Sequence, residues 1–248
     1  MPYRHLILDA DGTLFDFERS ESAALARTLG AEGIAVDTAL LTLYRTISLE
    51  LWQALERGET TPGRLRVERF ARLAERGGLA FDRSRVAAAY LDELALGIDL
   101  LPEVEETLAA LAGSTRMLLA TNGLATVQRR RFARAPIRRH FVDVVISEEI
   151  GAAKPQPEFF AEALRRLGDP PREEVLVVGD SLSADIAGAA AAGIDACWFN
   201  PRRLPLVGAR PRFEIAVLAE LPALVAERYT PPADLAARSA RRNSGRPR

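Results

Sequence analysis

Short apolar runs rich in Val, Ile and Leu recur along this chain and are bounded by turn residues. Runs of this length, without regular polar alternation, are typical of strands that are buried on both faces of a parallel sheet. The pattern therefore predicts strands at residues 5–8, 116–121, 142–147, 174–179 and 196–199.

Helical patterns lie between the later runs. Residues 157–167 repeat apolar positions at helical spacing, with Pro157 suited to a first turn and Gly168 to a C-terminal cap. A second helical segment begins near Ser183 and is closed by Gly193. Strands that alternate with helices predict an α/β fold, a parallel sheet with right-handed crossovers.

The alternation is interrupted between residues 17 and 97, where helical periodicity continues without a convincing strand. Here Thr61 is a candidate N-cap, Pro62 fits the first helical position, and the pair Gly77 and Gly78 predicts a stop. We expect an inserted all-helical cap over one end of the sheet, although a second domain of purely structural role fits the same pattern. The predicted parts are a core (1–16 and 98–228), the cap (17–97) and a disordered tail (229–248).

Composition narrows the class of protein. The chain is 48% hydrophobic and 27% charged, which is ordinary for a soluble globular protein. A net charge of −1 gives no indication of a nucleic-acid polymer or a membrane as partner. Without a secretory signal or a bilayer-length apolar run, we expect a cytoplasmic monomer or homodimer. The single cysteine, Cys197, cannot form an internal disulfide and is expected to be a small buried hydrophobe.

Polar residues stand at the carboxyl ends of three predicted strands, which is where open α/β sheets bind ligands. A lysine stands in the loop between the third and fourth strands. Together these segments bring acids, a hydroxyl, an amide and one cation to the same edge. The residues are Asp9, Asp11, Thr121, Asn122, Lys154, Asp180 and Asp185.

Such a set suggests a particular chemistry. Several carboxylates in one place repel one another unless a cation compensates, and oxygen ligands favour a hard ion such as Mg²⁺. Magnesium usually binds a few carboxylates together with substrate phosphate, so the substrate class indicated is a small phosphate ester. A carboxylate can also act as a nucleophile and form an aspartyl phosphate.

Four short motifs, taken in order, resemble those of the haloacid dehalogenase superfamily of hydrolases. They are DADGT (9–13), TN (121–122), KP (154–155) and GDSLSAD (179–185). The resemblance implies a Rossmann-like parallel sheet with an inserted helical cap. Residues 46–70 and 141–155 are similar to the YjjG-type pyrimidine 5'-nucleotidases of that superfamily.

By this resemblance, Asp9 is the nucleophile, and Asp11 is the acid that protonates the leaving alcohol and then the base that activates water. Asp9 and Asp180 would bind Mg²⁺ through carboxylates, and Asp11 through its backbone carbonyl. Asp185 would contact the ion or its waters.

The remaining roles concern the substrate. Thr121 and Asn122 would hold phosphoryl oxygens by a hydroxyl and a backbone amide, and Lys154 would neutralise both the phosphate and the nucleophile. Phe17 and Trp52 are candidates for lining a base pocket, although an aromatic on a cap helix is more often part of a core. We expect Arg129–Phe132 to form a solvated helix face.

Other interpretations stay open. Asp185 could be a first-turn acid that faces a helix dipole, and Lys154, considered in isolation, a solvated loop residue. Superfamily dehalogenases lack an aspartate at the position of Asp11, which favours phosphate chemistry. A phosphatase for another small metabolite, such as a sugar phosphate, a phosphomutase, and a catalytically inactive binding module remain as rivals to a nucleotidase.

Overall fold

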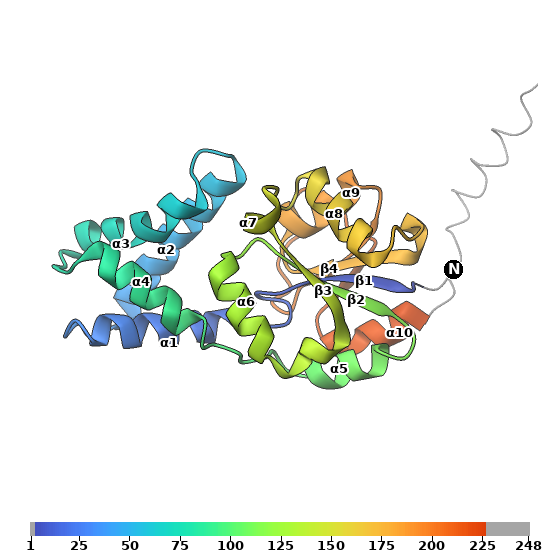
Figure 1. The fold of residues 1–248 in the computed structure, drawn as a ribbon, viewed down its shortest axis with the longest axis horizontal. Helices are drawn as coiled ribbons and strands as arrows, with labels where there is room; N and C mark the ends of the chain where they lie inside the picture. Colours follow the sequence, from blue (N-terminus) through green and yellow to red (C-terminus); the bar gives the residue numbers. More distant parts are fainter. Residues whose placement is uncertain (1–2, 227–248) are drawn as a thin grey trace, which may run out of the picture.

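The computed structural model describes residues 3–226 and shows a twisted sheet with a helical lobe at one end (Figure 1). Six strands run in the order β3-β2-β1-β4-β5-β6, and every neighbouring pair is parallel. This confirms the Rossmann-like α/β class, with the Asp9 strand in the middle of the sheet. The strands are β1 (His5–Asp9), β2 (Arg116–Thr121), β3 (Phe141–Ile146), β4 (Val175–Gly179), β5 (Asp195–Phe199) and β6 (Phe213–Ile215).

The edge strand β6 was not predicted from the sequence. It is only three residues long and pairs with β5 through Cys197, Trp198 and Phe199. Glu214, at its centre, is exposed, so the segment alternates like a half-solvated edge strand and has no continuous apolar run. Such a short alternation does not stand out from a loop.

Helices cover both faces of the sheet, α5 and α10 on one and α8 and α9 on the other (Figure 1). In β1, Leu6 and Leu8 belong to one hydrophobic core and Ile7 to the other, because successive side chains of a strand point to opposite faces. Cys197 is buried in the first core, and burial raises the pKa of its thiol to about 12, which confirms its role as a hydrophobe. The helices are α5 (Val104–Leu111), α6 (Ala125–Arg134), α7 (Ser147–Ile150), α8 (Pro157–Leu167), α9 (Ala187–Ala191) and α10 (Leu221–Ala226).

Short 3₁₀ turns at Pro136–His140, Arg172–Glu174 and Leu218–Glu220 connect these elements. After β4 the chain forms one turn of π-helix (Leu182–Ile186) before α9, where the sequence predicted a single regular helix. Gly193 follows with a positive φ of 69°, in agreement with the expected stop.

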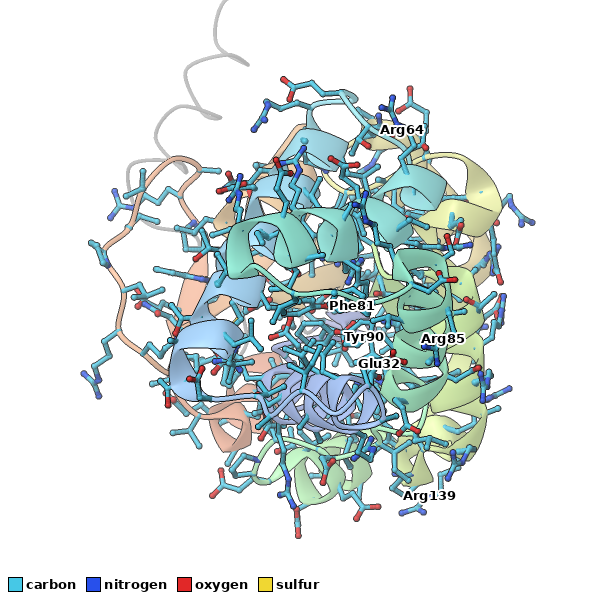
Figure 2. All side chains as sticks on the ribbon, turned by 90° about the vertical axis from the view of Figure 1, so that its left-hand side faces the viewer. Glu32, Arg64, Phe81, Arg85, Tyr90 and Arg139 are labelled. Atoms are coloured by element: carbon cyan, nitrogen blue, oxygen red, sulfur yellow. The ribbon has the colours of Figure 1, made fainter. Side chains whose placement is uncertain are left out.

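Of the five helices between β1 and β2, the first four form the lobe: α1 (Phe17–Gly30), α2 (Thr38–Glu56), α3 (Pro62–Gly77) and α4 (Arg83–Leu94). The side chain of Thr61 caps α3 by accepting from the amide of Arg64, and Gly78 ends it in the left-handed conformation. These helices pack around their own core, in which the rings of Tyr44, Phe70 and Tyr90 are in mutual contact. Figure 2 looks onto this lobe and shows Tyr90 in the layer of side chains between its helices.

The two connections between the lobe and the sheet run side by side. The amide of Asp16 donates to the carbonyl of Asp99 at 3.0 Å, and the amide of Leu101 donates to that of Leu14 at 2.9 Å. The helical lobe, called the cap below, therefore enters and leaves the sheet at one place, as an insertion does. No helix within residues 3–226 is long and apolar enough to cross a membrane. The tail predicted at 229–248 lies outside the described residues.

Candidate active site

A buried ion pair lies at the carboxyl end of β1. Lys154 Nζ donates to Asp9 Oδ1 at 2.5 Å, to Asp185 Oδ1 at 2.7 Å and to the carbonyl of Ala120 at 3.1 Å. Lys154 is 3% exposed, so its interpretation as a solvated loop lysine is wrong. Of the 33 lysine and arginine residues in the chain it is the single lysine, a sequence signal that sets this position apart from every other cation.

The three charges hold one another in place. Burial lowers the pKa of Lys154, but the carboxylates of Asp185 and Asp9 more than offset this and raise its pKa. Burial raises the pKa of Asp9 well above its usual value, against the lowering effect of Lys154. The ammonium of Lys154 is thus held charged between the carboxylates of Asp9 and Asp185, and it opposes the effect of burial on Asp9.

The second oxygen of Asp9, Oδ2, is buried and has no hydrogen-bond partner within the described part of the chain. Asp9, Asp180 and Asp185 each offer a carboxylate oxygen, and these three oxygens lie within 4.8 Å of one another. Burial and the charge of Asp185 raise the pKa of Asp180 to about 6. An unpartnered oxygen and clustered carboxylates fit a hard cation such as Mg²⁺.

Asp185 is 1% exposed and belongs to the π-turn after β4. Besides Lys154 it accepts a hydrogen bond from the amide of Ser181 at 3.1 Å. Asp185 is thus an acid in the first turn of this helix, and its carboxylate also pairs with the buried lysine. Irregular turns of this kind often occur at functional sites.

Two glycines allow the acidic residues to approach one another. A Cβ on Gly12, whose φ is 91°, would lie 2.5 Å from Asp180 Oδ2. A Cβ on Gly179 would lie 2.2 Å from Asp185 Oδ2. Any larger residue at either position would displace a carboxylate of the cluster.

Asp11 does not join this cluster. Its Oδ2 accepts from Gln128 Nε2 and its Oδ1 from Arg131 Nη1, both at 2.5 Å. Arg131 is fully buried, its Nε donates to the carbonyl of Gly97 at 2.7 Å, and its guanidinium lies over the ring of Phe15. It thereby connects Asp11 to the chain where it returns from the cap.

The expectation of a solvated face at Arg129–Phe132 is therefore wrong for half of its residues. Arg129 and Arg130 are exposed, but Arg131 and Phe132 are buried. Helical spacing could have shown this, because Arg131 lies seven positions after Leu124 and four after Val127, on the face that meets the interior. Arg129 and Arg130, on the opposite face of the helix, remain in solvent.

The residues that end β2 are close by. Thr121 is 2% exposed and its Oγ1 accepts from the amide of Gly123 at 3.0 Å. The side chain of Asn122 binds the backbone of Lys154 twice, with Nδ2 donating to its carbonyl and Oδ1 accepting from its amide, each at 2.8 Å. Asn122 thus holds the lysine loop against the sheet, a function that the sequence alone did not reveal.

A cavity of about 240 Å³ lies between these residues and the cap. All the residues predicted for the site line it: Asp9, Asp11, Thr121, Asn122, Lys154, Asp180, Asp185, Phe17 and Trp52. Its wall is completed by apolar residues of α4 and α6, among them Leu94 and Val127, and by Arg69 of α3. Phe17 and Trp52 are half-buried and face this space from α1 and α2.

The sequence model of one protein family, the haloacid dehalogenase-like hydrolases, matches residues 3–193 of this chain. The chain belongs to this family. It is thus an enzyme, and the names of its relatives place it among the family's phosphatases. Within the family, the chain is 32% identical over 226 residues to the pyrimidine 5'-nucleotidase YjjG of Escherichia coli, which covers 91% of this chain and 99% of that one.

Two further family members are similarly close. The pyrimidine 5'-nucleotidase PynA of Streptococcus pneumoniae is 34% identical over 217 residues, 87% of this chain and 92% of PynA. The magnesium-bound crystal structure of the HAD-hydrolase YfnB of Bacillus subtilis is similar at a TM-score of 0.86 and 31% identity, covering 92% of this chain and 100% of that one. Other family relatives are named phosphoserine phosphatase and glyceraldehyde 3-phosphate phosphatase.

Proposed function

We propose that the chain is a Mg²⁺-dependent phosphomonoesterase that hydrolyses nucleoside 5'-monophosphates, with pyrimidine nucleotides preferred. The observation that carries the proposal is the buried Asp9 Oδ2, which has no hydrogen-bond partner among residues 3–226 and lies beside Lys154 in a cluster of carboxylates. The similarity to YjjG and PynA supports the nucleotide class of substrate. The apolar wall with Phe17 and Trp52 suits a planar base.

In the proposed reaction a carboxylate oxygen of Asp9 attacks phosphorus, the ester P–O bond breaks, and Asp11 gives its proton to the leaving 5'-oxygen. Asp11 then takes a proton from water as the water oxygen attacks the aspartyl phosphate, which releases inorganic phosphate and regenerates Asp9. Lys154 offsets negative charge, and Thr121 and Asn122 hold phosphoryl oxygens. A bound Mg²⁺, held by Asp9, Asp180, Asp185 and the Asp11 carbonyl, would neutralise phosphoryl charge.

A panel of substrates tests both parts of the proposal. Initial rates should be measured for UMP, CMP, dTMP, AMP, ribose 5-phosphate and phosphoserine, with Mg²⁺ and then with excess chelator. We expect the highest kcat/KM for pyrimidine nucleotides and loss of turnover with chelator. A higher kcat/KM for ribose 5-phosphate or phosphoserine would refute the substrate class, and turnover that survives the chelator would refute the metal requirement.

The Arg131 contact yields a separate prediction. Arg131→Lys keeps a positive charge but loses the fork that joins Asp11 to Gly97, so Asp11 should be less well placed to protonate the leaving oxygen. We expect kcat for UMP to fall about 10- to 100-fold, because an alcohol leaving group needs a positioned acid. The fall should be smaller for p-nitrophenyl phosphate, whose leaving group needs little protonation.

Arg129→Lys is the matched control, since Arg129 is exposed and pairs with Glu149 on the same surface. Thermal unfolding of both variants shows whether the fold is intact. An equal fall for the two substrates would mean that Arg131 does not act through Asp11.

A further inference from the structure

The cap contributes one buried cation to the wall of the cavity. Arg69 of α3 is 3% exposed and lines the same cavity as Asp9, beside Phe17 and Trp52. It belongs to none of the four motifs, and the proposed reaction at phosphorus does not use it.

Most of the Arg69 guanidinium is fixed by the cap. Its Nη1 donates to Tyr44 Oη at 3.2 Å, its Nε donates to the carbonyl of Leu65 at 3.3 Å, and its Cζ lies 5.7 Å from the centre of the Tyr90 ring. Nη2, by contrast, is buried with no hydrogen-bond partner in the part of the chain that the structure describes. A buried donor without an acceptor is costly, by about 1 to 3 kcal/mol or more for a charged group, so such a donor in a cavity wall indicates a ligand.

The charges around Arg69 indicate what kind of ligand atom could accept a hydrogen bond from its Nη2. Burial lowers its pKa, but Tyr44, Tyr90 and Glu21 offset this and the pKa is raised, so the guanidinium stays protonated. Glu21 acts on it only through its charge, because the Glu21 carboxylate accepts from Arg45 Nε at 3.0 Å. Because the negative charge of Glu21 already acts on it, Arg69 can donate to a neutral oxygen of the substrate as well as to a carboxylate.

We propose that Arg69 Nη2 donates a hydrogen bond to a carbonyl oxygen of a pyrimidine base whose ring contacts Phe17 and Trp52. Uracil, cytosine and thymine share a carbonyl at C2, whereas adenine has no carbonyl. The inference rests on the proposed 5'-nucleotidase function and adds a specificity-determining residue to it. The cavity wall then supplies a polar group for each part of the substrate, Asp9 for phosphorus and Arg69 for the base.

The test is the ratio of kcat/KM for UMP to kcat/KM for ribose 5-phosphate, which carries the same phosphate and sugar without a base. Arg69→Met should lower this ratio about 10- to 100-fold, the cost of one charged hydrogen bond. Arg72→Met is the control, because Arg72 lies on the same helix but pairs with Glu50 and Glu68 outside the cavity, and it should leave the ratio within about twofold of wild type. An unchanged ratio in Arg69→Met would overturn the assignment.

A second measurement uses the wild-type enzyme, in case Arg69→Met does not fold. The 5'-phosphate of a phenyl riboside has a six-membered aromatic ring but no carbonyl, and its kcat/KM should be about 10- to 100-fold below that of UMP. Equal values would refute the hydrogen bond. A wild-type enzyme that does not favour UMP over ribose 5-phosphate refutes the proposed function itself. A preference for phosphoserine that Arg69→Met abolishes would show that Arg69 binds a carboxylate and overturn the base assignment.

Discussion

Asp9→Asn should lower kcat for nucleotide hydrolysis by about 10⁴-fold or more. The amide keeps nearly the shape of the carboxylate, so the change removes the attacking oxygen with little disturbance of packing. The reaction of the wild-type enzyme with labelled substrate, stopped with acid, should yield a protein-bound phosphate that the variant lacks. A variant that retains turnover would disprove the aspartyl phosphate route.

Asp143→Asn is the control for this experiment. Asp143 lies on β3, two strands from Asp9 in the same sheet, and pairs with Arg166 away from the cavity. It should leave kcat unchanged within about twofold, because surface substitutions of this kind have small effects. A fall like that of Asp9→Asn would point to a general effect of neutralising acids in the sheet.

Lys154→Met should cause the largest loss of stability among single substitutions in the site. It removes the cation that Asp9 and Asp185 share while keeping an apolar side chain of similar length. Breaking a buried ion pair at one partner typically costs about 3 to 5 kcal/mol, because the remaining charge is buried without compensation. We expect a decrease of that size in the free energy of unfolding at pH 8 with chelator, measured in urea.

The loss should depend on pH with a definite sign. Burial already raises the pKa of Asp9, and removing Lys154 raises this pKa further. Between the unfolded and the folded pKa, the folded variant therefore keeps a proton on Asp9 that the unfolded chain has released. That contribution to stability is present below the unfolded pKa of about 4 and is lost as pH rises through the folded pKa. The difference in the free energy of unfolding between wild type and Lys154→Met should therefore become smaller as pH falls from 8 toward 5.

Mg²⁺ should raise the free energy of unfolding of Lys154→Met more than that of the wild type, because in the variant the metal ion can offset the carboxylate charge that the lysine no longer offsets. The control is Arg165→Met, whose exposed guanidinium pairs with Glu162 on the surface of α8. It should change the free energy of unfolding only slightly. If Lys154→Met cost no more than this control at pH 8 without metal, the buried lysine would not be holding ionised carboxylates.

The sequence alone predicted those parts of the structure that are determined by a local pattern of residues. Five strands, the caps at Thr61 and Gly78, and the convergence of Asp9, Lys154 and Asp180 on one edge all follow from short runs and from the parallel topology. Parallel strands bring their carboxyl ends together whatever the length of chain between them, so residues far apart in sequence could be placed in one site.

What the sequence did not reveal depends on pairing between distant segments. Nothing near Arg131 in the chain indicates that it meets Asp11, 120 positions away, or that Asn122 grips the backbone of Lys154. Arg69 belongs to the segment 46–70 that resembles the nucleotidase cap, but its role in the cavity wall was not predicted, because its burial depends on how the cap helices pack. Such contacts are set by tertiary packing, which overrides the local preference of arginine for solvent.

The single lysine of this chain has a practical consequence. Protein made with lysine that carries ¹⁵N only at Nζ would hold one labelled nitrogen, and its ammonium group lies between the carboxylates of Asp9 and Asp185 at the candidate site. Its nuclear magnetic resonance signal would report the arrival of phosphate or metal without mutation, without a second signal to assign and without an added dye. Because the other 32 of the 33 lysine and arginine positions are arginine, the candidate site can be observed by one spectroscopic signal of its own.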